Sequence, residues 1–305
     1  MTVRASAPAK TNVVLSVGRK RADGYHGLAT IFQALDLRDE VVVAQRPAGA
    51  GVQVSVSGAD ADAVPDDHTN LAAQATHLMA ERYDISPDVQ ITITKAIPVA
   101  GGMAGGSADA AATLVALNAL WHLHLSRDAL AELGFQLGSD VPFSLHGGTM
   151  LGLGRGERLT PVLSTGVLHW VVAVCHGGLS TPSVYREFDR LTASRNCGDP
   201  SVPDAALQAL RTGDVAALGG RLANDLQPAA LHLMPSLAQV LSDGSDAGAL
   251  GGIVSGSGPT VVFLARDREH AIDLAVLMSA SGRLRRVHAV TGGALGATVE
   301  STDDD

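Results

Sequence analysis

A glycine-dense segment at residues 98–109 is the first candidate for chemistry in this sequence. It reads Pro-Val-Ala-Gly-Gly-Met-Ala-Gly-Gly-Ser-Ala-Asp and lies between a predicted strand and a predicted helix. Glycine lets the backbone adopt positive φ and approach a ligand closely. A helix start offers unpaired N–H groups and the positive end of its dipole to an anion. The segment therefore predicts a phosphate-binding loop in preference to a merely flexible turn, with Ser107 either as the helix N-cap or as a hydroxyl facing a phosphate or Mg²⁺.

Two familiar nucleotide-binding patterns do not fit this loop. No lysine follows its last glycine, so the segment is not a Walker A loop. The Gly-x-Gly-x-x-Gly spacing of dinucleotide-binding proteins is also missing. An oxidoreductase is accordingly the weakest of the function classes considered.

Residues 98–108 resemble the phosphate-binding motif of the GHMP kinases, whose pattern is Pro-x-x-x-Gly-Leu-Gly-Gly-Ser-Ser/Ala. This chain has Met103 and Ala104 where Leu and Gly are usual. Further segments match family motifs in the expected order. They are Ala-Pro-Ala-Lys-Thr-Asn at 7–12, Arg-Ala-Asp-Gly-Tyr-His at 21–26, Leu-Gly-Ser-Asp-Val-Pro-Phe at 137–143 and Gly-Ser-Gly-Pro-Thr at 256–260.

The segment at 21–26 is the most specific of these. It is similar to the branch of the family that acts on a cytidine diphosphate joined to a branched sugar alcohol in non-mevalonate isoprenoid biosynthesis. The resemblance implies ATP-dependent phosphorylation of the 2-hydroxyl of that substrate. It also implies a two-lobed fold with the active site between the lobes.

The resemblance assigns the catalytic work to Asp140 and Lys10. A carboxylate can act as a general base that accepts the proton of the attacking hydroxyl. A lysine can keep that carboxylate ionised and stabilise charge on the transferring phosphoryl group. From residue type alone, Asp140 in its Gly-Ser-Asp turn is more often a helix N-cap, and Lys10 is more often a surface lysine beside a strand. The surrounding motifs favour the catalytic interpretation of both.

The resemblance also assigns the binding residues. Tyr25 and His26 are expected to hold the cytosine, because a flat base needs a stacking face and groups that pair with its edge. Asn12 is expected to hydrogen-bond the substrate, Tyr185 to add a second aromatic face, and Gly256 and Gly258 to let the backbone approach the substrate phosphates. A core position for Tyr185 is nearly as consistent with the sequence, and both glycines could simply form a tight turn.

ATP is expected along the loop that Pro98, Val99, Ala100, Gly101, Gly102, Met103, Ala104, Gly105, Gly106, Ser107 and Ala108 form. Asn70 and Lys95 are candidates near the adenine or the ribose. Asn70 could equally cap the following helix, and Lys95 could face solvent. Mg²⁺ is expected because phosphoryl transfer from ATP needs its charge neutralised, but the sequence does not identify its protein ligands.

Composition excludes several other classes. The net charge of −9 argues against a nucleic-acid partner, which needs a basic face. No apolar run approaches the ~18 residues of a membrane helix. Cys175 and Cys197 form neither a metal-binding spacing nor a disulfide framework, so a cytoplasmic location is expected. The expected partner is the small-molecule substrate that the resemblance implies, and the oligomeric state is not predicted.

The elements that must position these residues follow from hydrophobic spacing. Strands are predicted at 12–17, 41–44, 52–56, 89–94, 168–174 and 286–290, and a strand–turn–strand unit at 251–264. Helices are predicted at 70–83, 110–120, 127–137, 183–193, 204–223 and 269–280. Residues 18–27 are predicted to be a loop, and 303–305 a solvated end.

Strands and helices alternate without a regular βαβ rhythm, so the predicted class is α+β. At roughly 150 residues per domain, the 305 residues suggest two domains. We expect an ATP-binding part at 1–160 and a substrate-side part at 161–305. Two alternatives remain beside this kinase: another GHMP kinase of the homoserine or mevalonate type, which the Tyr25–His26 loop opposes, and a non-catalytic sugar or nucleotide sensor, which Lys10 and Asp140 oppose.

Overall fold

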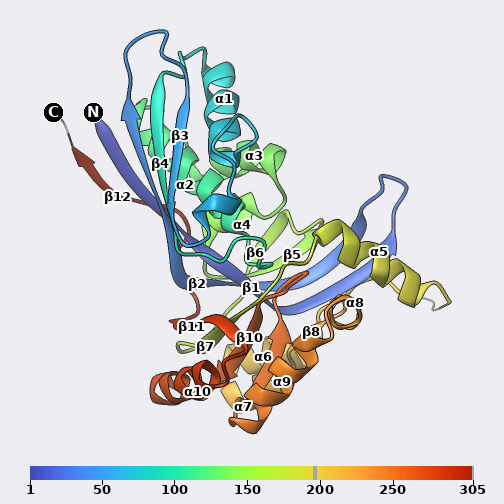
Figure 1. Ribbon diagram of the computed structural model, residues 1–305. Helices are drawn as coiled ribbons and strands as arrows, with labels where there is room; N and C mark the ends of the chain where they lie inside the picture. The colour runs from blue at the N-terminus through green and yellow to red at the C-terminus, as the bar shows by residue number, and fades with distance from the viewer. Residues whose placement is uncertain (195–197, 304–305) are drawn as a thin grey trace.

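A computed structural model describes residues 1–194 and 198–303. Two mixed layers of helices and strands build the molecule, and a long hairpin crosses between them (Figure 1). The hairpin consists of β1 (Thr2–Lys20) and β2 (His26–Gln45), which pair antiparallel along nearly their whole length. The predicted α+β class and the two-lobed architecture are confirmed.

The first sheet has the order β12-β1-β2-β4-β3. Its further strands are β3 (Gln53–Gly58), β4 (Val89–Lys95), β5 (Thr149–Gly154), β6 (Arg158–Pro161), β8 (Ala223–Asn224) and β12 (Thr298–Asp303). One half of β2 pairs with β4 and the other half with β5. Register shifts in β1 after Pro8 and after Asn12 bend the hairpin, as β-bulges do.

Helices cover this first sheet in the upper part of Figure 1. They are α1 (Leu71–Tyr83), α2 (Gly105–Leu120), α3 (Arg127–Leu137) and α4 (Val141–His146), with the short 3₁₀ helix η1 (Ala61–Ala63). Helix α2 packs against β1, β2 and α1 and is apolar nearly all round, as a buried central helix must be. Its alanines let the helix lie close to the sheet.

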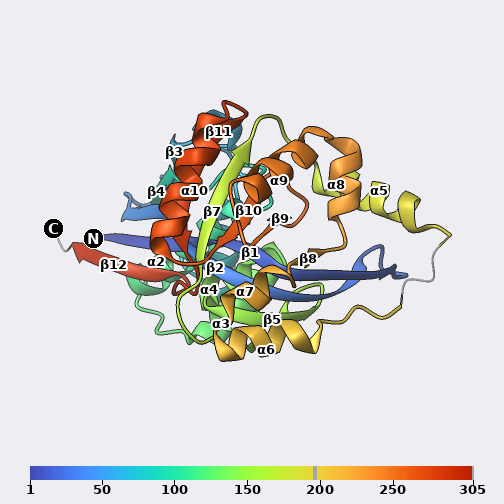
Figure 2. The ribbon, with the colours of Figure 1, turned by 90° about the horizontal axis from the view of Figure 1, so that it is seen from below.

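The second sheet has the order β11-β7-β10-β9 and is antiparallel throughout. Its strands are β7 (His169–Cys175), β9 (Gly251–Val254), β10 (Val261–Ala265) and β11 (Leu284–Thr291). The helices of this part are α5 (Thr181–Thr192), α6 (Asp204–Thr212), α7 (Val215–Gly219), α8 (Gln227–Leu233), α9 (Ser236–Asp246) and α10 (Arg268–Ala280). Figure 2 shows α9 and α10 over the outer face of this sheet.

Polar contacts join the two sheets. The indole Nε1 of Trp170 in β7 donates to Gln33 Oε1 in β2 at 2.6 Å, with both side chains buried. Arg285 and Arg286 in β11 each donate to Asp60 Oδ1 at 2.6 Å, just before η1. Strands β8 and β12, from the later part of the chain, pair with β1. The division near residue 160 therefore stays a prediction, because the later segment contributes strands to both sheets.

Most predicted elements are present, with several corrections. Helix α2 begins at Gly105, five residues before the predicted start, after Ala104 at φ 60°. Ser107 is thus in the first turn and is not the N-cap. The predicted helix at 204–223 is two helices, because Gly213 at φ 68° ends α6.

The β strands extend beyond their predicted bounds. The strand predicted at 12–17 spans 19 residues, and the loop predicted at 18–27 is mostly strand outside a short turn at 22–24. Residue 303 belongs to β12, whereas residues 304–305 of the predicted solvated end lie outside the described residues. Helices η1, α4, α8 and α9 and strands β5, β6, β8 and β12 were not predicted. Among residues 1–194 and 198–303, none of the helices combines the length and the apolar character needed to cross a bilayer.

A buried ion cluster lies where β2, β4 and α2 meet. The ammonium of Lys95 at the end of β4 contacts Asp39 in β2 and Asp109 Oδ2 in α2, the latter at 2.6 Å, and all three side chains are at most 3% exposed. Asp39 Oδ1 also accepts the N–H groups of Ala96 and Ile97 at 2.7 and 2.8 Å. The cluster therefore fixes the chain where it leaves the sheet toward the glycine-rich loop.

Two carboxylates share one ammonium in this cluster, so its fully ionised form carries a buried net charge of −1. Burial, together with repulsion by Asp39, raises the pKa of Asp109 to about 7 against the attraction of Lys95. Burial lowers the pKa of Lys95, but the attraction of Asp109 and Asp39 outweighs it and raises that pKa overall. Near neutral pH, Asp109 in this cluster is therefore present in both its protonated and its ionised form.

We predict that Asp109→Asn removes part of the pH dependence of stability. Between the pKa of 3.8 in the unfolded chain and about 7 in the folded protein, the folded state retains a proton that the unfolded state has lost. The free energy of unfolding therefore falls as pH rises through this window, by on the order of 2–4 kcal/mol from this group. Urea unfolding at pH 5 and pH 7.5 should show a smaller fall for the variant, whereas parallel pH curves would contradict the protonation argument.

Candidate active site

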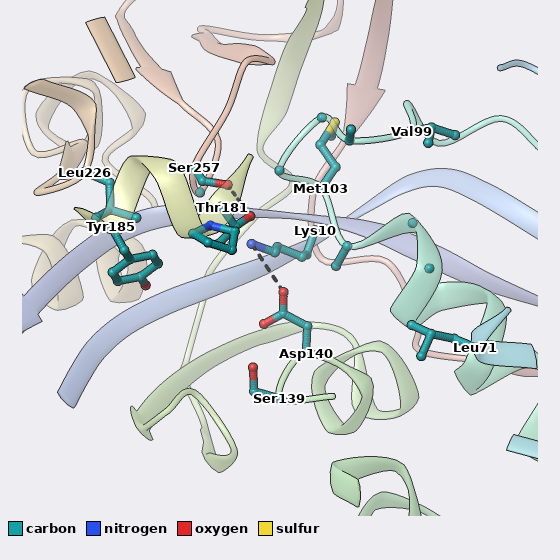
Figure 3. A pocket seen from close by; sticks show the side chains of 18 of the residues that line it. Lys10, Leu71, Val99, Met103, Ser139, Asp140, Thr181, Tyr185, Leu226 and Ser257 are labelled. Atoms are coloured by element: carbon teal, nitrogen blue, oxygen red, sulfur yellow. Dashed lines mark hydrogen bonds and ion pairs between the residues drawn. The ribbon is translucent and has the colours of Figure 1, made fainter. Parts of the chain in front are cut away.

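A cavity of about 890 Å³ opens beside the β1–β2 hairpin and is lined by residues from both parts of the chain (Figure 3). Most predicted site residues line it. These are Lys10, Asn12, Tyr25, His26, Asn70, Lys95, every residue from Pro98 to Gly106, Asp140, Tyr185 and Gly256. Ser107, Ala108 and Gly258 were predicted but are not among the lining residues. Segments predicted separately along the chain thus converge on one cavity.

Lys10 and Asp140 face each other across this cavity. Lys10 Nζ lies 3.7 Å from Asp140 Oδ2, as the dashed line in Figure 3 marks. Asp140 occupies the N-cap position of α4, but its side chain accepts no capping hydrogen bond. The carboxylate is 30% exposed and points into the cavity. Asp140 therefore occupies the N-cap position without making the capping hydrogen bond, and its carboxylate oxygens remain accessible to a ligand.

A chain of hydrogen bonds holds the Lys10 ammonium in place. Its Nζ donates to Asn12 Oδ1 at 3.0 Å, and Asn12 Nδ2 donates to Thr30 Oγ1 at 2.7 Å. The Thr30 hydroxyl then donates to the carbonyl of Val14 at 2.6 Å. Lys10 is only 6% exposed, so the alternative of a surface lysine is wrong. Asn12 serves as an acceptor for Lys10 in this arrangement.

The glycine-rich loop is attached to both sheets. The backbone N–H of Lys10 in β1 donates to the Met103 carbonyl at 3.1 Å. On the other side, Ser255 Oγ donates to the Gly102 carbonyl at 3.2 Å. A Cβ at Gly102, whose φ is +75°, would come within 2.1 Å of the Ser255 carbonyl oxygen, so only glycine fits there. Ala104 takes φ 60° without a glycine and places the start of α2 at the cavity.

Two predicted nucleotide-binding residues have partners within the protein. Asn70 caps α1, since its Oδ1 accepts from Ala72 N at 2.8 Å and its Nδ2 donates to the Pro65 carbonyl at 2.6 Å. Lys95 is the centre of the buried ion cluster and does not face solvent. Both residues still line the cavity, so contact of either with a nucleotide stays a prediction.

An aromatic region lies at the other end of the cavity. The rings of His26 and Tyr185 lie 5.0 Å apart, and His26 Nε2 lies 2.7 Å from Asp189 Oδ1. Burial, with the charge of Asp140, raises the pKa of Tyr185, so its phenol remains protonated. Tyr25 is 50% exposed at the cavity mouth. The arrangement offers flat faces for a base and polar groups for its edge.

Sequence reasoning missed several residues of the cavity. Thr181 at the start of α5 and Ser257 hydrogen-bond each other at 2.8 Å, as Figure 3 shows. Arg155 contacts Tyr25 from the β5–β6 turn. Asp109 could have been noticed as the one charged residue within an alanine-rich buried helix. Ser257 lies within the motif at 256–260 but was not singled out, and Thr181 and Arg155 lie in none of the motifs quoted above.

Cysteine chemistry is not available in the described part of the cavity. Cys175 lies buried in β7 as a free thiol, and burial raises its pKa to about 11. A thiol with that pKa is a poor nucleophile. Cys197 lies outside the described residues.

Comparison with known proteins identifies the family. The family model for the GHMP kinases N terminal domain matches residues 70–148, and that for GHMP kinases C terminal matches residues 206–283. A protein of Streptomyces coelicolor named 4-diphosphocytidyl-2-C-methyl-D-erythritol kinase is 52% identical over 98% of this chain and 99% of its own length. A protein of Rhodococcus jostii with the same name is 54% identical over 96% of this chain and 93% of its own.

Solved structures agree with this assignment. The crystal structure of a 4-(cytidine 5'-diphospho)-2C-methyl-D-erythritol kinase matches with a TM-score of 0.79 and 34% identity, over 95% of this chain and 99% of that one. The mevalonate kinase of L. major matches with a TM-score of 0.77 at 17% identity, over 94% of each chain, which shows the shared fold alone. The homoserine, mevalonate and sensor alternatives are therefore not favoured. This chain belongs to the 4-diphosphocytidyl-2-C-methyl-D-erythritol kinases, a family of ATP-dependent small-molecule kinases within the GHMP kinases.

Proposed function

We propose that this chain transfers the γ-phosphoryl group of ATP to the 2-hydroxyl of 4-diphosphocytidyl-2-C-methyl-D-erythritol, in non-mevalonate isoprenoid precursor biosynthesis in the cytoplasm. One observation carries the proposal. The Lys10–Asp140 pair and the start of α2 face a single cavity that also holds an aromatic region. In this proposal the start of α2 binds phosphate, the Asp140 carboxylate acts as the general base, and the aromatic region binds the cytosine. The names of the relatives at more than 50% identity supply the substrate.

The triphosphate binds along the loop and the start of α2. The first N–H groups of an α-helix have no partner within the helix, and the helix dipole favours an anion at that end. Residues 105–107 form this first turn, and Gly105 and Gly106 add no side chain between the backbone and a phosphate. The adenosine then extends toward Asn70 and Leu71 at the start of α1, where Val64 and Pro65 also line the cavity.

Asp140 acts as the general base and Lys10 as the fixed cation. Asp140 accepts the proton of the substrate 2-hydroxyl as that oxygen attacks the γ-phosphorus and ADP leaves. Lys10 Nζ, 3.7 Å from Asp140 Oδ2, is close enough to stabilise negative charge on the transferring group. Because Asn12 already accepts a hydrogen bond from Lys10, the ammonium is oriented before the substrate arrives.

The cytidine end of the substrate lies in the aromatic region. Tyr25 and Tyr185 offer stacking faces, and His26 can pair with the edge of the base. Asp189 contacts His26 Nε2 and so fixes the orientation of the imidazole. Gly256 brings backbone close to Lys10, since a Cβ there would lie 3.3 Å from Nζ, and this leaves room for substrate phosphates.

Mg²⁺ fits this site as an ion held mainly by phosphates. Within residues 1–194 and 198–303, no three acidic, histidine or cysteine side chains are grouped to hold a metal. Mg²⁺ commonly keeps several waters and takes few protein ligands beside nucleotide phosphates. Ser107 in the first turn of α2 would supply a hydroxyl ligand. When bound, the ion neutralises charge on the β- and γ-phosphates.

We predict that Asp140→Asn lowers kcat by about 10²- to 10⁴-fold, because the amide cannot accept the hydroxyl proton. ATP affinity should remain within about twofold. A coupled assay for ADP gives kcat, and calorimetry gives the ATP affinity. Asp246→Asn, at an exposed position in α9, is the matched control and should keep wild-type turnover. Turnover of the Asp140 variant near that of the control would remove Asp140 from the mechanism.

We predict that Gly106→Val weakens ATP binding by about tenfold or more. A Cβ at this position already lies 3.3 Å from Leu71 Cδ1, and both residues line the cavity, so a branched side chain would crowd the cavity at the start of α2. Calorimetry with a non-hydrolysable ATP analogue measures the effect. An unchanged ATP affinity would place the triphosphate elsewhere.

A further inference from the structure

Tyr25 lies at the tip of the β1–β2 hairpin, where few contacts hold its ring. The residue follows β1 in the short turn before β2 and is half exposed. One face of its ring is covered by Arg155, whose guanidinium carbon lies 3.6 Å from the ring centroid. Both residues line the cavity. The uncovered face of the ring is therefore the one available to a ligand.

The turn that carries Arg155 has a fixed geometry. Gly154 and Gly156, at φ 80° and 103°, flank Arg155 between β5 and β6. The backbone N–H of Arg155 donates to Glu157 Oε2 at 2.5 Å. Both glycines have a positive φ that L side chains rarely adopt, so the turn tolerates little change at these two positions. The backbone of Arg155 is thus placed by the turn, and its side chain extends from there over the Tyr25 ring.

The Arg155 side chain connects three separate elements. Its guanidinium carbon also lies 5.7 Å from the ring centroid of Phe135 in α3. Its Nε is buried and, within the described residues, has no hydrogen-bond partner. At the hairpin tip, Asp23 has its pKa lowered chiefly by Arg21, with a smaller effect of Arg155. Stacking on Tyr25 is therefore the principal contact that this arginine makes with the tip.

We propose that Arg155 is a positioning residue for recognition of the pyrimidine. It covers one face of Tyr25 and holds the opposite face toward the cavity, where the cytosine stacks. This inference rests on the proposed function, because it requires a cytidine nucleotide as substrate. An aromatic ring held in its bound orientation loses less conformational entropy on binding, so affinity for the base is higher. A guanidinium stacked on the ring supplies this constraint and keeps its charge throughout the physiological pH range.

The test is a double-mutant cycle with Tyr25→Ala, Arg155→Ala and the double variant, assayed with both substrates. Tyr25→Ala removes the stacking face and should raise the KM for the cytidine substrate about tenfold or more. Arg155→Ala should raise the same KM about three- to tenfold. In the Tyr25→Ala background, Arg155→Ala should have no further effect, because the ring that it positions is gone. The kcat and the KM for ATP should stay within about twofold in all three variants.

Two further variants complete the design. Arg155→Lys keeps the charge but loses the planar stack, so its KM for the cytidine substrate should lie between wild type and Arg155→Ala. Arg158→Ala, in β6 and outside the cavity lining, is the control for loss of a nearby arginine and should match wild type.

The outcomes separate this inference from the proposed function. If wild type turns over the cytidine substrate but the Arg155 effect is absent, or is equally large without Tyr25, the positioning role is overturned while the function stands. If wild type does not turn over the cytidine substrate, the proposed function falls and this inference falls with it.

Discussion

The contact between Gly102 and Ser255 is the constraint on which the rest of the site depends. A loop that binds phosphate through its backbone must have a fixed shape, because the N–H groups act only if they point at the anion. At Gly102 the loop touches the second sheet so closely that no side chain fits, and at Met103 it accepts a hydrogen bond from β1. The loop is therefore held in place from both sides. Because α2 begins directly after the loop, the position of its first turn is fixed as well.

The β1–β2 hairpin also fixes the proposed reacting groups. Lys10 donates its backbone N–H to the loop and its ammonium to Asn12, so one strand sets both the phosphate site and the cation. Behind the loop, the Lys95 cluster joins β2, β4 and α2. Asp140 lies at the N-cap of the short helix α4, which positions its carboxylate. A displacement of β1 would accordingly alter phosphate binding and proton transfer together.

Much of this site could be predicted because its residues form local motifs. Lys10, the glycine-rich loop and Asp140 each lie in a short segment whose function depends on local backbone shape, and all of them line one cavity. The helix at 70–83 was also predictable, since Asn70 is a strong N-cap before an apolar periodicity. The early start of α2 was missed because two glycines and a serine have low helix propensity, which burial of the helix overrides.

Features that depend on distant pairing could not be predicted. The length of β1 reflects its pairing with β2, β8 and β12, and no property of residues 2–11 alone indicates a strand there. Asp39 and Asp109 are 70 residues apart, and the sequence does not indicate that β4 brings Lys95 between them. Arg155 acquires its role only when the β5–β6 turn meets the hairpin tip.

The hairpin also explains how one fold serves different substrates. Mevalonate and homoserine kinases share this architecture at 13–20% identity, so the fold by itself does not select the acceptor. In this chain the β1–β2 hairpin carries Lys10 near the middle of β1 and Tyr25 and His26 at its tip. A substrate with a base at the proper distance from its hydroxyl can contact both regions at once. Under the proposed function, selectivity depends on how firmly the tip is held, and Arg155 stacks on Tyr25 at that tip.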